Sequence, residues 1–176
     1  MHSTIYEFSE HPISEKQRAN TDNLPEWFFQ TVADYATDLD SITRAVQIHC
    51  LEQCFDNLCI RDEDQLRFSN NFKERYFRES YRYFMAAVNA LAHTGYTVFA
   101  GIITAPAFDA AFNGIVESYA DKTGFYIYDS DHRELLPLDA WLRKADLSKL
   151  YFLGGIMDYH SLINLKHGSA ANLCCG

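Results

Sequence analysis

The chain has 176 residues, and its hydrophobic fraction of 48%, with 13 Phe and 11 Tyr, excludes a disordered protein. A net charge of −9 argues against direct binding to nucleic acid, whose phosphates select clustered Lys and Arg. Met1–Glu10 lacks the pattern of a secretory signal, and no apolar stretch reaches the ~20 residues that cross a membrane, so we expect a cytoplasmic protein with reduced cysteines and no membrane partner.

Length and composition predict one globular domain over residues 1–166, followed by a disordered tail at 167–176. Acidic residues are concentrated in the N-terminal part of the chain. Residues 1–40 carry eight Asp or Glu against two Lys or Arg, residues 41–93 carry seven of each, and residues 94–176 carry nine against six. This distribution favours a protein partner with a basic surface.

The first predicted elements are a strand at Thr4–Phe8 and, after a polar loop, a helix that begins near Pro25. One helical stripe is apolar: Phe28, Val32, Tyr35 and Leu39. A second face is acidic and has no Lys or Arg placed to relieve its charge; its residues are Glu26, Asp34 and Asp38. We expect this acidic stripe to bind the basic partner; the alternative interpretation is a solvated acidic face without a partner.

The next segment, Ser41 to Cys59, contains three of the five cysteines and is predicted to be a second helix. At about 100° per residue, Cys50, Cys54 and Cys59 all fall in its apolar arc, whereas His49 points elsewhere. Their spacing matches no structural zinc pattern. We therefore expect buried, unbridged thiols that bind no metal and no other cofactor.

A third amphipathic helix is predicted over Asn71–His93, and Tyr96–Ile103 is β-branched and aromatic like a buried strand. A fourth helix begins at Pro106 and ends before Gly124. Its apolar pattern is formed by Phe108, Ala111, Phe112, Ile115, Val116 and Tyr119.

The C-terminal part reads as strands at Phe125–Asp129, Arg133–Pro137 and Leu150–Met157, with a short helix at Asp139–Lys144. Gly154 and Gly155 lie within the last strand and lack the spacing of a phosphate loop, so they indicate a bulge or close backbone packing. The predicted fold is α+β, with about four amphipathic helices packed on a small mixed or antiparallel sheet and strands mainly in the C-terminal half.

Polar side chains follow two of these strands. They are Asp129, Asp131 and His132 after one strand, and Asp158 and His160 after another. Carboxylates and imidazoles can form a divalent-metal or general-base site if the two segments converge. A tight turn and a strand that leaves the core explain the same residues without chemistry.

Two functions stay open. The first is a non-catalytic interaction or regulatory domain that uses the acidic stripe, for example to inhibit a nucleic-acid-handling protein by charge mimicry. The alternative is a small metal-assisted hydrolase with its site around Asp129–His132 and Asp158–His160.

Overall fold

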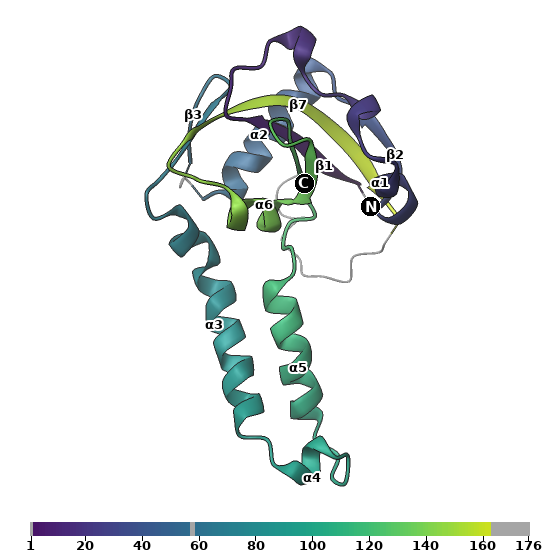
Figure 1. Ribbon diagram of the computed structural model, residues 1–176, viewed down its shortest axis with the longest axis vertical. Helices are drawn as coiled ribbons and strands as arrows, with labels where there is room; N and C mark the ends of the chain where they lie inside the picture. The colour runs from purple at the N-terminus through teal and green to yellow at the C-terminus, as the bar shows by residue number, and fades with distance from the viewer. Residues whose placement is uncertain (1, 57–58, 163–176) are drawn as a thin grey trace. The chain divides into compact units, whose positions relative to one another are not determined.

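The computed structural model describes residues 2–56 and 59–162, so the predicted tail at 167–176 lies outside the described residues. The chain divides into two compact units (Figure 1). We call residues 1–72 with 121–176 the sheet unit, and Lys73–Ala120 the hairpin unit. Helices packed with a mixed sheet confirm the predicted α+β class. No helix in the described ranges is long and apolar enough to cross a bilayer.

The sheet unit is built on a sheet whose order is β3-β4-β7-β1-β5-β6, with β2 also paired to β7. Only the β1–β5 pair is parallel among the described ladders. The strands are β1 (His2–Ser9), β2 (Ala33–Asp38), β3 (Cys59–Asp62), β4 (Gln65–Phe68), β5 (Tyr126–Asp129), β6 (Glu134–Pro137) and β7 (Leu150–Ser161).

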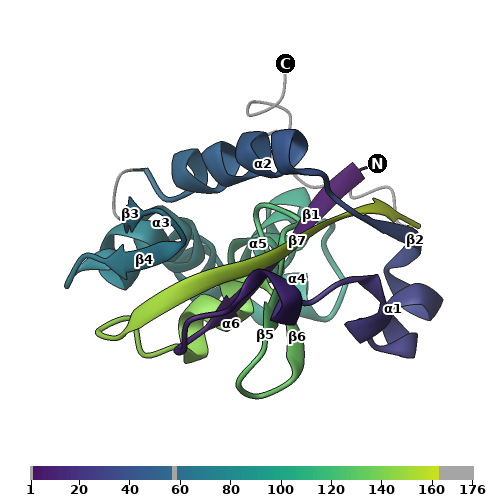
Figure 2. The same ribbon diagram turned by 90° about the horizontal axis from the view of Figure 1, so that it is seen from above.

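Strand β1 occupies the centre and sends alternate side chains to opposite faces. The Thr4 and Tyr6 hydroxyls donate hydrogen bonds to Gln47 of α2 (Ser41–Cys54), which lies along one face (Figure 2). Ile5 is fully buried in a cluster with Phe28 of α1 (Glu26–Thr31). Each face of this strand is therefore covered by a different helix.

The segment between β1 and α1 contains the short 3₁₀ helices Glu15–Gln17 and Thr21–Asn23 and is fastened to the sheet by Glu7. The buried Glu7 carboxylate accepts hydrogen bonds from the Ala19 and Gly155 backbone N–H groups, each at 2.6 Å, and from the Ser130 hydroxyl. A Cβ at Gly155 would collide with the Ala19 carbonyl oxygen. The close backbone packing predicted for the glycine pair is confirmed.

An aromatic group packs where α6 (Leu138–Lys144) meets β4 and β7. Trp141 lies edge-on to Phe8 at 4.9 Å and to Tyr151 at 5.0 Å between ring centroids. Phe68 contacts both Phe55 and Phe72 in the same edge-on geometry. These aromatic residues form much of the second half of the core.

The hairpin unit consists of most of α3 (Phe72–Ala92), α4 (Tyr96–Phe99) and α5 (Pro106–Tyr119). Helices α3 and α5 confirm the predictions for their segments. The buried strand predicted over Tyr96–Ile103 is wrong, because its first half is helical and Tyr96, Phe99 and Ile102 are exposed. The segment has strand-like composition but no neighbouring strand with which to pair.

Two helix boundaries also differ from the prediction. Helix α1 ends at Thr31, and Ala33–Asp38 pairs with β7 as a strand, so tertiary pairing overrides the helical spacing of Val32 and Tyr35. Helix α2 ends at Cys54, and Cys59 begins β3. Strand β7 supplies hydrogen bonds that sequence periodicity does not reveal.

Candidate functional site

Two histidine–aspartate pairs lie side by side at the end of the sheet where β1 and β2 begin and β7 ends. His2 Nδ1 is 2.6 Å from Asp158 Oδ2, and His160 Nδ1 is 2.9 Å from Asp34 Oδ1. The two imidazole centroids are 5.2 Å apart, and the Tyr35 ring stacks on His160 at 5.5 Å. We call these five residues the sheet-end cluster.

Each carboxylate in this cluster faces the Nδ1 atom of its histidine. A neutral imidazole that donates Nδ1–H to a carboxylate presents Nε2 as a proton acceptor. Desolvation raises the pKa of Asp34, but the hydrogen bond and charge of His160 outweigh it and hold this pKa below its ordinary value. The cluster therefore has the components of a general acid–base pair. Across residues 2–56 and 59–162, no three His, Cys, Asp or Glu side chains are arranged to hold a metal ion.

The structure does not bring the two predicted groups of acids and histidines together. Asp129 is opposite Phe8 of β1, whereas His160 is opposite His2. Six positions of a strand span roughly 20 Å. Because β5 runs parallel to β1 and β7 runs antiparallel, the groups after these strands lie at opposite ends of the sheet.

Asp129, Asp131 and His132 instead form the turn between β5 and β6. Asp129 accepts hydrogen bonds from the His132 backbone at 3.0 Å and the Trp141 indole at 3.1 Å. Asp131 accepts hydrogen bonds from the Ser9 hydroxyl and the Glu10 backbone. The hydrogen bond from His132 Nδ1 to Asp129 raises the pKa of His132. These contacts agree with the turn interpretation of the segment.

The predicted acidic stripe is not a helical face. Glu26 is on α1 and accepts a hydrogen bond from the Gln30 side chain, whereas Asp34 and Asp38 are on β2. Asp34 pairs with His160, and Asp38 accepts a hydrogen bond from the Thr21 backbone. Because α1 ends before Asp34, Asp34 and Asp38 lie four positions apart on one strand and not on one face of a helix.

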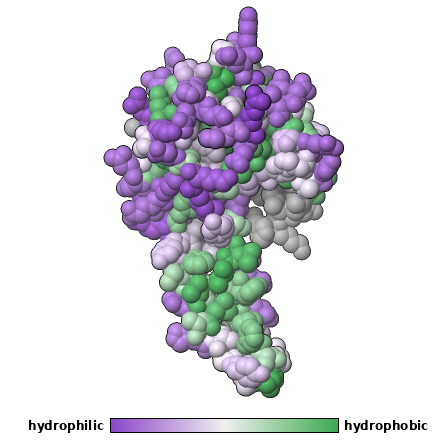
Figure 3. All heavy atoms as spheres, viewed as in Figure 1, coloured by the Kyte–Doolittle hydropathy of each residue, from purple (hydrophilic) through white to green (hydrophobic). Residues whose placement is uncertain are grey.

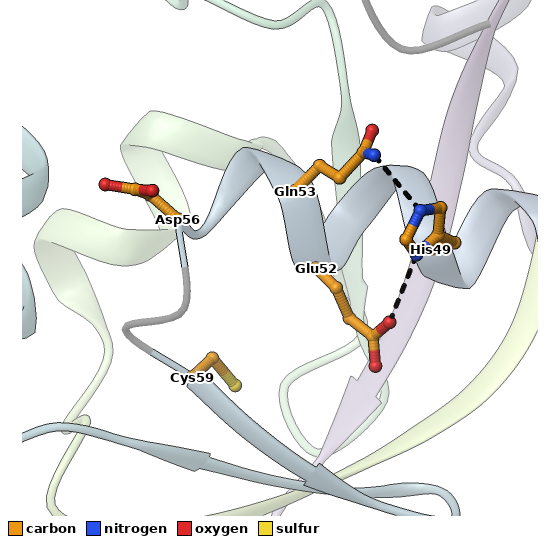
Figure 4. A pocket seen from close by; sticks show the side chains of 5 residues that line it. All are labelled: His49, Glu52, Gln53, Asp56 and Cys59. Carbon is orange, nitrogen blue, oxygen red and sulfur yellow. Dashed lines mark hydrogen bonds and ion pairs between the residues drawn. The ribbon is translucent and has the colours of Figure 1, made fainter.

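The cysteine-rich segment lines a cavity of about 430 Å³ (Figure 4). His49 and Glu52 contribute to its wall, and the Cys59 side chain projects towards it from β3. Burial raises the pKa of Cys59 to about 12, so this sulfur is a neutral thiol and a poor nucleophile at pH 7. Cys50 is buried as predicted, whereas Cys54 and Cys59 are half-buried, and all three are unbridged.

The hairpin unit carries the most exposed apolar surface. Its helices meet at Gly114 of α5, where an added Cβ would lie 3.5 Å from the Ala87 Cβ of α3. On α5, Phe112, Val116 and Tyr119 repeat at i, i+4 and i+7 and are 58%, 61% and 66% exposed. Figure 3 shows hydrophobic side chains gathered over α3 and α5 on the side in view.

The apolar residues of α3 lie on the same side of the hairpin as those of α5. Tyr81, Met85 and Val88 repeat with the same i, i+4, i+7 spacing. At about 100° per residue, Tyr81, Met85 and Val88 are rotated by about 100–160° from Ala87, whereas Phe112, Val116 and Tyr119 are rotated in the same sense by about 140–200° from Gly114. In antiparallel helices, rotations in the same sense emerge on one side, so Phe112 and Tyr119 share the side of the α3 stripe and Val116 lies at its outer edge. We call this surface the hairpin face; its residues are Tyr81, Met85, Val88, Phe112, Val116 and Tyr119.

Sequence reasoning missed His2 and Tyr35 because their positions in the cluster depend on the pairing of β1 and β2 with β7. It also took the apolar positions of α5 for core. The sequence pattern alone does not separate a buried stripe from an exposed one, because both have the same i, i+4, i+7 spacing.

Comparison with known proteins found no matching family model, no matching curated protein and no matching solved structure.

Proposed function

We propose that this protein is an interaction domain that binds a protein partner through the hairpin face. The observation that carries this proposal is the exposure of Phe112, Val116 and Tyr119 along one side of α5. Single exposed apolar residues are ordinary, but the exposed Tyr81, Phe112, Val116 and Tyr119, together with the half-buried Met85 and Val88, form a patch over two adjacent helices. Patches of this kind mark interaction surfaces in soluble proteins.

The chemistry of the face suits a protein contact. Aromatic residues and Met are enriched at the centres of protein interfaces, and charged residues are depleted there. The face has both properties, since Tyr81, Met85, Phe112 and Tyr119 belong to it and no charged residue does.

Photo-crosslinking tests this proposal. Phe112 is replaced by p-benzoylphenylalanine in the full chain, and the adducts formed in a cell extract and with pure protein are weighed by mass spectrometry. We expect one adduct of defined mass, which Val116→Glu abolishes. The same photoreactive residue at Ala110, on the other flank of α5, is the matched control and should give no such adduct. Equal, non-specific labelling at both positions would contradict the proposal.

A basic partner remains a separate proposal for the sheet unit. The hairpin unit has four Lys or Arg and four Asp or Glu, so the net charge of −9 belongs to the rest of the chain. This charge supports attraction of a basic protein near Glu26, Asp34 and Asp38. Pull-down with Asp34→Lys plus Asp38→Lys should then lose that partner. The unbridged state of Cys50, Cys54 and Cys59, the three described cysteines, supports our further proposal of a reducing, cytoplasmic location.

The sheet-end cluster supports a second candidate function, which is hydrolysis by general acid–base catalysis. The specific observation is that two imidazoles, each oriented by a carboxylate, lie 5.2 Å apart. Such a pair can take a proton from water and give one to a leaving group. Hydrolysis of activated esters and phosphodiesters should then be lost in His160→Gln and retained in His132→Gln. Equal rates in the two variants would contradict it.

A further inference from the structure

We propose that the hairpin face is covered by a second copy of this chain, so that two hairpins form an antiparallel four-helix bundle. The inference rests on the proposed function, because it identifies the partner of the same face. In this arrangement α3 of one copy lies over α5 of the other, and both hairpin turns are at the same end of the bundle.

The hairpin unit lacks a core of its own. Every residue from 73 to 120 is described, and the buried ones are Ser80, Ala87 and Ala111, none of which has a large apolar side chain. Two helices that pack only on each other gain little stability unless their apolar stripes are packed against another element. A second hairpin supplies that element and completes a bundle core.

The exposed area is sufficient for a stable dimer. The six residues of the hairpin face, together with the exposed Tyr96, Phe99, Ile102 and Ile103, offer on the order of 1,000 Å² of side-chain surface. A standard interface uses about 800 Å² per partner. A two-fold axis lets one self-complementary face serve both copies.

The charges of the two helices also favour a second copy. Helix α3 carries Lys73, Arg75, Arg78 and Arg82 against Glu74 and Glu79, a balance of +2. Helix α5 carries Asp109 and Glu117 and no base, a balance of −2. With Ala87 level with Gly114, placing α3 over α5 of the other copy brings Glu117 close to the level of Arg82, whereas Asp109 lies nearer the hairpin turn than any of the α3 bases.

Other occupants fit less well. A helix that lies on a membrane surface usually flanks its apolar stripe with Lys or Arg, whereas α5 has only acids and the bases of α3 are confined to residues 73–82, where two glutamates partly offset them. Residues 163–176 of this chain include only three large aliphatic side chains, Ile163, Leu165 and Leu173. A basic protein has no acidic residue to bind among the six residues of the hairpin face.

Sedimentation equilibrium of the full chain tests the inference. We expect twice the monomer mass for the wild type at about 50 µM, with a micromolar or tighter dissociation constant. Phe112→Glu should weaken dimerisation at least a hundredfold, because it introduces two buried charges per dimer. Ala110→Glu places the same charge on the opposite flank of α5 and should leave the dimer intact.

Several outcomes would overturn the inference, and they separate it from the proposed function. A wild-type monomer overturns it whether or not the variants fold. A monomer that gives a defined heterologous adduct at position 112 keeps the proposed function and rejects self-association. A monomer that co-sediments with phosphatidylcholine vesicles assigns the face to lipid and rejects both. A dimer that Phe112→Glu leaves unchanged places the interface elsewhere and also rejects the inference.

Discussion

Gly114 of α5 faces Ala87 of α3 across the hairpin, with 3.5 Å between the Ala87 Cβ and the position of a Cβ added at Gly114. This is an ordinary van der Waals distance, so the helices meet closely at this point with room for a methyl group. The contact fixes which side of each helix faces inward. It therefore also fixes which side carries Phe112 and Val116.

Gly114→Ala should stabilise the protein. Ala costs less backbone entropy than Gly inside a helix, and its methyl group fits against Ala87, so we expect a gain of about 0.5–1 kcal/mol. Thermal unfolding followed by circular dichroism measures it. A lower melting temperature would show that the helices are closer than the structure places them.

Gly155→Ala should have the opposite effect. The added methyl group would collide with the Ala19 carbonyl oxygen, which is backbone and cannot swing away. We expect a loss of at least about 2 kcal/mol in the free energy of unfolding. Gly95→Ala is the control, because a Cβ there meets nothing within 4 Å. Equal stability of the two variants would refute the close contact.

The sequence predicts the elements whose backbone hydrogen bonds are local, and it misses those whose hydrogen-bond partners lie far away in the chain. Helices such as α3 and α5 satisfy their own backbone, and local periodicity located both. Segment Ala33–Asp38 has its partner in β7, more than a hundred residues later, and its spacing resembled a helix. Tyr96–Phe99 shows the converse error, because strand-like residues are exposed in a short helix.

The same reason limits prediction of the candidate sites. Asp158 and His160 were identified from the sequence, but their partners His2 and Asp34 come from other strands. The direction of β5 relative to β7 decides that Asp129 is far from His160, and direction is not encoded locally. The hairpin face was visible as a helical pattern, but its exposure depends on what packs against it.

The pH dependence of stability should carry a contribution from Asp121. Burial, and next the Asp139 carboxylate, raise the pKa of Asp121 to about 6. Since an unfolded Asp titrates near ~3.9, the folded state binds this proton more tightly and stability falls as pH rises from about 4 to about 6. Asp139→Asn removes the negative neighbour and should reduce that fall.

Urea unfolding at about pH 4.5 and about pH 7 measures this difference in the wild type and the variant. An identical fall in both proteins would show that Asp139 has no influence on Asp121.

His160→Gln should raise the pKa of Asp34. The histidine holds this pKa low by its hydrogen bond and its charge, and neutral Gln provides no positive charge. Carbon-13 NMR of the carboxyl group follows the titration. His132→Gln, at the other end of the sheet, should leave Asp34 unchanged. An unchanged Asp34 in His160→Gln would contradict the pairing.

Amide hydrogen exchange of α5 as a function of protein concentration tests the central claim, that the hairpin face is covered by a second copy of this chain. A helix that lacks a core of its own opens easily unless its apolar side is packed. We predict that amides from Phe112 to Tyr119 are protected in concentrated protein and exchange faster on dilution below the dissociation constant, while those of β1 do not change. Exchange in α5 that is independent of concentration would contradict the account.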